Sequence, residues 1–155
     1  MKFLLLICLA ICCSHKCNDF KVLEATSQKW VGGIISAGSG INYQLTLVAN
    51  QSSKKIKIDQ LWVGDQYFKV TAIKKFPASE KEGFEKGDTI YINAMVAHPR
   101  PISPVSGEGD PTYIKPSKSP PFSYDGAALI GYELNKKRKF IIVEKIKKIS
   151  SIAYP

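Results

Sequence analysis

The sequence predicts an all-β protein, built as a single antiparallel β-sandwich of about seven strands. Three observations favour this class: short segments rich in β-branched and aromatic residues recur along the chain, turn residues separate them at short intervals, and no segment shows the hydrophobic period of a helix. With 155 residues, the chain fits one domain with one hydrophobic core. A small β-barrel is the alternative, because sequence alone does not reveal whether the first and last strands pair.

The first predicted strands differ in regularity. Residues 28–35 are rich in β-formers but contain two glycines, so we expect a strand that bends before a turn at residues 36–40. Residues 41–49 alternate apolar and polar side chains, which predicts a half-buried strand whose apolar face includes Leu45 and Leu47.

The middle of the chain continues this pattern with one interruption. Residues 54–58 alternate lysine and isoleucine, which places the isoleucines inward. The alternation breaks at Leu61 and Trp62, which indicates a bulge or a crossing between sheets. Gly64 and Asp65 predict a type II′ hairpin turn, and we expect the strand after it to continue to about Lys74. Residues 89–96 alternate again and predict the next strand.

Prolines set the next segment apart. Seven of the nine prolines lie in residues 99–121, so no regular strand is expected there and we predict a long loop. A hairpin is predicted beyond it, with strands at residues 127–134 and 139–146 and a turn at residues 135–138. The tail after residue 146 is expected to be irregular.

The N-terminus predicts export. All four cysteines lie in the first seventeen residues, MKFLLLICLAICCSHKC, where one lysine precedes an apolar run that is too short to span a bilayer. A cysteine at the end of such a signal is the residue that the lipoprotein pathway acylates with palmitate-type chains, so we predict lipidation at Cys13, with Cys12 and Cys17 as alternatives. The predicted organisation is a signal and anchor region at 1–17, a tether at 18–27, and a sandwich domain at 28–150 that includes the Pro-rich loop.

Four phrases of the sequence carry a resemblance. GSGINYQL, LWVGDQYF, FEKGDTIYI and ALIGYELNKKRKF resemble segments of small uncharacterised lipoproteins of the Bacteroidota that have an immunoglobulin-like β-sandwich. The resemblance covers residues 30–146. It implies that fold and a cell-envelope location, where we expect outer-membrane anchoring, and it supplies no catalytic residues.

The chain is basic, with a formal net charge of +9. One group of cations lies at residues 54–57, and a second, made of Lys136, Lys137, Arg138 and Lys139, is expected to fill a hairpin turn as a candidate partner-binding site. One interpretation is that these residues keep strand faces and edges soluble. The functional interpretation is contact with a membrane, an envelope protein or an anionic glycolipid, whereas nucleic acid is excluded as a partner outside the cytoplasm.

The residues needed for catalysis are not grouped in the sequence. His98 is the sole histidine after the signal region, and no cysteine follows Cys17, so a zinc site lacks ligands. No G-x-S-x-G elbow is present, and Glu108 with Asp110 supplies too few oxygens for calcium. We therefore expect no cofactor, no metal and no enzymatic activity, and a binding or scaffolding role instead.

A carbohydrate-binding module is the alternative function. Trp30, Trp62, Tyr67 and Tyr91 would form a stacking platform for sugars if they were exposed on a sheet. Aromatic side chains more often supply core volume, so we expect both tryptophans in the core. The exposure of the two indole rings discriminates between these interpretations.

Overall fold

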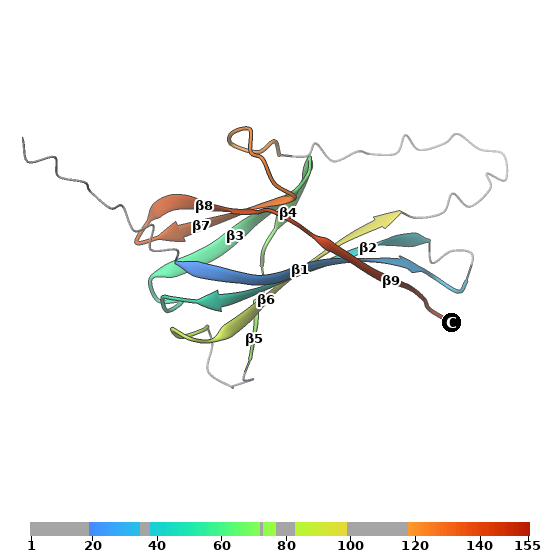
Figure 1. The fold of residues 1–155 in the computed structure, drawn as a ribbon, viewed down its shortest axis with the longest axis horizontal. Coiled ribbons are helices and arrows are strands. Elements are labelled where there is room, and N and C mark those ends of the chain that lie inside the picture. Colours follow the sequence, from blue (N-terminus) through green and yellow to red (C-terminus); the bar gives the residue numbers. More distant parts are fainter. Residues whose placement is uncertain (1–18, 35–37, 72, 77–82, 99–117) are drawn as a thin grey trace, which may run out of the picture.

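Two β-sheets pack face to face in the computed structural model of this chain, which describes residues 19–34, 38–71, 73–76, 83–98 and 118–155 (Figure 1). One sheet has the strand order β5-β6-β2-β1-β9, with β1 (Phe20–Val31), β2 (Ser39–Ala49), β5 (Lys74–Phe76), β6 (Thr89–His98) and β9 (Lys147–Ala153). The other has the order β4-β3-β7-β8, with β3 (Ile56–Val63), β4 (Gln66–Lys69), β7 (Ala128–Leu134) and β8 (Lys137–Val143). The predicted β-sandwich is confirmed, and the two sheets do not join into a small β-barrel.

The chain alternates between the sheets in units of one hairpin. β1–β2 and β5–β6 are antiparallel pairs of the five-stranded sheet, whereas β3–β4 and β7–β8 are antiparallel pairs of the four-stranded sheet. β9 then returns to the five-stranded sheet and pairs with β1 in parallel. The described residues therefore contain nine strands rather than about seven, and one strand pair is not antiparallel.

The core lies between the inner faces of the two sheets. The predicted alternation of β2 is confirmed, because Leu45 and Leu47 are both 0% exposed, and Ile56 and Ile58 of β3 also point inward. The other large members of this core are Phe20, Leu61, Ile90, Ile92, Ile130 and Tyr132. Truncating one of the buried leucines or isoleucines to alanine typically costs about 2–5 kcal/mol, so this layer holds the sheets together.

The predicted irregularity of β3 exists but begins earlier. The pairing with β7 shifts register between Ile58 and Gln60, so Leu61 points into the core and Trp62 points to the outer face. Trp62 is nevertheless only 1% exposed, because Tyr67 and Phe140 pack against its ring. Its indole N–H donates to the carbonyl of Lys118 at 2.8 Å, which fixes the end of the Pro-rich segment on this face.

The prediction of a tether at residues 18–27 is wrong, because β1 already begins at Phe20. Phe20 is 1% exposed and contacts the rings of Phe84 and Tyr132, so it closes one end of the core. The pairing of β1 with β2 shifts register between Val22 and Glu24, and this bulge removes the alternation that would have marked the strand in the sequence.

Two further expectations are corrected at the ends of strands. β4 ends at Lys69, and Lys74–Phe76 forms the separate strand β5 in the other sheet, so no single strand continues to residue 74. The tail after residue 146 is not irregular but forms β9, whose side chains are all exposed. Backbone pairing with β1 holds β9 in place, and the side chain of Gln28 adds a hydrogen bond to the carbonyl of Ser150 at 2.9 Å.

Some predictions fall outside the described residues. The signal, the predicted lipidation site Cys13 and the Pro-rich loop as far as residue 117 belong to these. In the part of the chain that the structure describes, no helix has the length and apolar character needed to cross a membrane.

Candidate functional site

A buried carboxylate fixes the point where the chain enters the sandwich. Asp19 is 5% exposed, and its Oδ2 accepts hydrogen bonds from the Tyr132 hydroxyl at 2.8 Å and from the Lys139 ammonium at 2.9 Å. Its carbonyl accepts the backbone N–H of Asn50 at 2.9 Å. Burial, and secondly the hydrogen bond and charge of Asp19, raise the pKa of Tyr132 well above its ordinary value. Residue 19 is therefore tied to β7, to β8 and to the turn after β2.

The turn between β7 and β8 is tighter than predicted. Leu134 pairs with Lys137, so only Asn135 and Lys136 form the turn, with φ values of 49° and 65°. Positive φ at both central residues is the type I′ geometry, which matches the twist of a hairpin. Lys137, Arg138 and Lys139 consequently lie on β8 and point alternately to its two sides.

Because side chains along a strand alternate between its two faces, the predicted basic group is divided between the two sides of β8. The guanidinium of Arg138 donates to Asp59 Oδ2 and to Glu133 Oε1, each at 2.9 Å, on the outer face of the four-stranded sheet. The hydrogen bonds with Asp59 raise the pKa of Arg138 above its ordinary value. Lys139 points to the opposite side, where it pairs with Asp19. Two of the four predicted partner-binding residues are thus occupied by intramolecular ion pairs.

Two further lysines lie beside Lys136 and Lys137, the other two members of the predicted basic group. The N–H of Asn135 donates to the carbonyl of Lys55 at 2.9 Å, so the turn after β2 lies beside the β7–β8 turn. This brings the exposed Lys54 and Lys55 next to the exposed Lys136 and Lys137. We call these four lysines the basic end. Among the described residues, none of the four ammonium groups pairs with a carboxylate.

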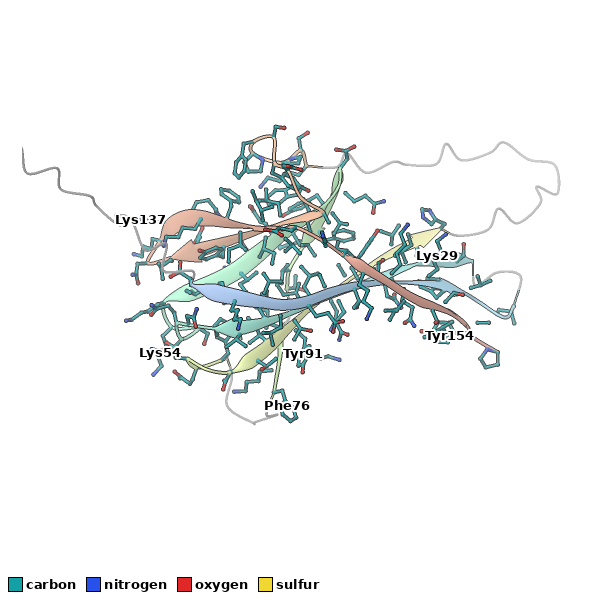
Figure 2. All side chains as sticks on the ribbon, in the orientation of Figure 1. Lys29, Lys54, Phe76, Tyr91, Lys137 and Tyr154 are labelled. Carbon is teal, nitrogen blue, oxygen red and sulfur yellow. The ribbon has the colours of Figure 1, made fainter. Side chains whose placement is uncertain are left out.

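Asp19 belongs to the same end of the molecule as these lysines. Asn50, which binds its carbonyl, begins the turn that carries Lys54 and Lys55, and Lys139, which binds its carboxylate, lies two residues after Lys137. Figure 2 shows Lys54 and Lys137 at one end of the sandwich and Tyr154 at the other. The chain therefore enters the fold at its basic end.

A hollow of the surface lies at this entry point. It has a volume of about 870 Å³ and runs between the edge of β1, at residues 19–25, and the segment 141–145 of β8 and its continuation. β9 pairs with β1 only from Thr26 onward, so this part of β1 has an edge to which no other described strand is paired. The hollow is lined by mixed polar and apolar residues, with Leu23 and Ile142 half exposed, and no set of acid, base and nucleophile converges in it.

A different kind of surface covers the outer face of the five-stranded sheet. The polar residues Gln28, Asn42, Gln44 and Asn93 occupy this face, opposite the core residues of the same strands. Two hollows of about 380 and 480 Å³ lie on it and share Asn42 and Met95 as lining residues. Trp30 and Tyr154 line the second hollow, with their ring centroids 6.3 Å apart.

The expectation that both tryptophans belong to the core between the sheets is not met. Trp62 is buried, but on the outer face of the four-stranded sheet, so it offers no platform to a ligand. Trp30 is half-buried and lies outside the core cluster. The polar alternation of residues 42 and 44 was visible in the sequence, but their position beside Trp30 depends on strand pairing that it did not reveal.

Groups for catalysis are not assembled in the described part of the chain. His98 lies exposed at the end of β6, opposite Ser39 of β2. Across the same residues there is no group of three or more histidine, cysteine or acidic side chains that could hold a metal ion. Comparisons with protein-family models, with curated proteins and with solved structures find no match to this chain.

Proposed function

We propose that this protein is a non-enzymatic lipoprotein of the cell envelope, anchored through Cys13, whose basic end faces an anionic membrane surface. The observation that carries the proposal is the position of Asp19, which holds the start of the sandwich at the basic end. None of the four lysines gathered there pairs with a carboxylate of another described residue. The role is one of binding or scaffolding.

The short stretch of chain between Cys13 and Asp19 supports this orientation. Cys13 precedes Asp19 by six residues, which span at most about 20 Å when extended. A lipid on Cys13 would hold the basic end near the headgroups, where each lysine adds roughly 1 kcal/mol of attraction within about one Debye length. The anchor and the lysines would thus act on the same end of the molecule.

The backbone at Lys136 supports a role for its charge. The residue has a φ of 65°, a conformation that costs an L-residue with a side chain roughly 1–2 kcal/mol and that glycine adopts freely. Asn-Gly is the preferred pair for this turn, so the chain carries a lysine where glycine would be more stable. Backbone strain of this kind is a reason to look for a function at the residue.

Charge reversal tests the orientation. Full-length protein with Lys54→Glu and Lys137→Glu should bind vesicles of phosphatidylcholine and phosphatidylglycerol about tenfold or more weakly, because two attractive charges become repulsive. The matched control is Lys29→Glu with Lys148→Glu, which changes the net charge equally but on strands β1 and β9, away from the basic end. Equal weakening by both pairs would overturn the orientation.

Replacement of the predicted acyl acceptor tests the anchor separately. Cys13→Ser should abolish acylation, seen as the loss of the lipid mass from the natural N-terminus, and should release the protein from membranes washed with high salt. Cys12→Ser and Cys17→Ser are the matched controls. Retained acylation in Cys13→Ser would transfer the site to one of these, and an unmodified wild-type chain would end the lipoprotein proposal.

A further inference from the structure

Four neutral amides lie together on the outer face of the five-stranded sheet. Gln44 and Asn93 are direct partners across β2 and β6, and Gln28 and Asn42 are direct partners across β1 and β2. Directly opposed side chains in antiparallel strands stand about 4.5–5.5 Å apart, so the four amides form a compact array. Within the described part of the chain, the amides of Asn42, Gln44 and Asn93 make no hydrogen bond.

An aromatic wall borders this array. The indole of Trp30 lies over Gly40, where a Cβ would come within 2.7 Å of two ring atoms, so the ring lies close to the sheet. Tyr154 meets Trp30 edge to face and is 47% exposed, and Met95 is 60% exposed beside them. The buried indole N–H of Trp30 has no hydrogen-bond partner among the residues that the structure describes. The site thus combines apolar ring surface with unsatisfied polar groups.

Charged side chains are missing from the described lining of the two hollows, which is informative in a chain with 22 lysines and arginines. No lysine, arginine, aspartate or glutamate lines either of the two hollows on this face. An anionic ligand would therefore gain little from the side chains that line these two hollows, although Lys74 and Lys147 lie elsewhere on the same face of the sheet.

We infer that this face is a binding site for a neutral saccharide, with Trp30 and Tyr154 as the stacking wall and Asn42, Gln44 and Asn93 as the polar contacts. A sugar hydroxyl both donates and accepts hydrogen bonds, and a primary amide offers both functions in return. The C–H faces of sugar rings pack on aromatic rings, whose faces are electron-rich. Few convergent polar groups beside apolar surface are the usual composition of a ligand site.

The saccharide site is separate from the basic end. Tyr154 follows β9 at the end of the molecule opposite Lys54 and Lys137 (Figure 2). With the basic end held at a membrane, the site would face away from it, toward external glycans. The inference does not depend on the anchor, and it stands or falls on measurements made without a membrane.

Tryptophan emission offers a direct measurement on the full-length protein in a detergent that contains no sugar. The probes are maltohexaose, cellohexaose and mannohexaose, and polygalacturonate is the anionic comparison. At least one neutral hexasaccharide should shift the emission in a saturable way that salt does not weaken. Trp30→Phe should abolish the shift, because Trp62 is buried on the other sheet and serves as an internal reference.

Variants of the amide residues test the polar contacts separately from stacking on the Trp30 ring. Gln44→Ala combined with Asn93→Ala should weaken binding of the same hexasaccharide about tenfold, as measured by calorimetry, since two hydrogen bonds are lost. Gln66→Ala, which removes an exposed amide from β4 of the other sheet, is the matched control and should leave the affinity unchanged.

Four outcomes would overturn the inference. One is that none of the three neutral hexasaccharides binds. Another is that Gln66→Ala weakens binding as much as Gln44→Ala combined with Asn93→Ala does. The third is a dimer in sedimentation that Trp30→Phe dissociates, because the face would then be covered by a second copy of the chain. Binding of polygalacturonate alone, lost at high salt, would also assign sugar affinity to the lysines and not to this face.

Discussion

The indole ring of Trp30 packs over Gly40, its direct partner on the neighbouring strand. A Cβ at residue 40 would meet ring atoms Cε2 and Cζ2 at 2.7 Å and the carbonyl oxygen of Val96 at 2.0 Å. The contact with Val96 is to backbone, which cannot move aside as a flexible side chain can. Glycine is therefore required at residue 40 if Trp30 is to keep its place on the outer face.

Gly40→Ala should lower the free energy of unfolding by about 1–3 kcal/mol, because the added methyl forces the backbone or the ring to shift. Urea unfolding measures the loss, and the emission of Trp30 should move toward that of an exposed indole. Thr46→Ala, further along the same strand, is the control and should change stability by less than about 0.5 kcal/mol. A Gly40→Ala protein of unchanged stability would refute the close packing.

Tyr132→Phe should destabilise the protein at neutral pH by about 1.5–3 kcal/mol, because the hydroxyl donates to the buried carboxylate of Asp19. The folded state raises the pKa of Tyr132 above the unfolded value of 10.0, so the stabilisation is fully present below pH 10 and is lost as the pH rises beyond it. Urea unfolding of both proteins at a series of pH values checks this.

The difference between wild type and Tyr132→Phe should therefore be constant up to about pH 9 and shrink above pH 10. Tyr43→Phe is the control, since the Tyr43 hydroxyl has no hydrogen bond to another described residue. A difference that stays constant into the alkaline range would contradict the hydrogen bond between Tyr132 and Asp19.

Lys136→Gly should stabilise the β7–β8 hairpin by roughly 0.5–1 kcal/mol, because glycine adopts a φ of 65° without strain. Thermal unfolding would show the gain as a higher Tm. The same variant should bind anionic vesicles more weakly, since one charge of the basic end is lost. Greater stability without weaker binding would mean that Lys136 does not contribute to the proposed membrane contact.

Arg138→Ala should leave binding to anionic vesicles nearly unchanged, although the residue belongs to the basic group that the sequence suggests. Its guanidinium is held by Asp59 and Glu133, so it offers little charge to a partner. The ion pairs are partly exposed, and their loss should cost at most about 1 kcal/mol, with less effect at high salt. A loss of vesicle binding as large as that of Lys54→Glu with Lys137→Glu would contradict this assignment.

The local alternation of apolar and polar residues was sufficient to predict the strands that have one face in the core. The alternation of β2, β3 and β6 predicted their inner faces correctly, because a half-buried strand needs an apolar residue at every second position. β1 escaped detection before Gln28, since a bulge at Val22 and Glu24 breaks the alternation. β9 carries no buried side chain, and its position depends only on hydrogen bonds to a strand far away in the sequence.

The candidate sites were harder to predict for the same reason. Arg138 is 79 residues from Asp59, and Lys139 is 120 residues from Asp19, so no local signal reveals that these cations are already paired. The proximity of Lys55 to Asn135 likewise follows from the β3–β7 pairing. Sequence supplied the residue types, and the pairing of distant strands decided which of them are available.

The place of β9 beside β1 imposes an order on how the sheet is completed. β1 is hydrogen-bonded to β2 on one side, and among the described residues the other edge of its half from Thr26 to Val31 is covered only by residues 147–153. During synthesis those residues emerge after every other strand of the sandwich, so the nascent polypeptide keeps a bare edge until its last ladder is made. Folding of the five-stranded sheet is therefore complete only after residues 147–153 have been made.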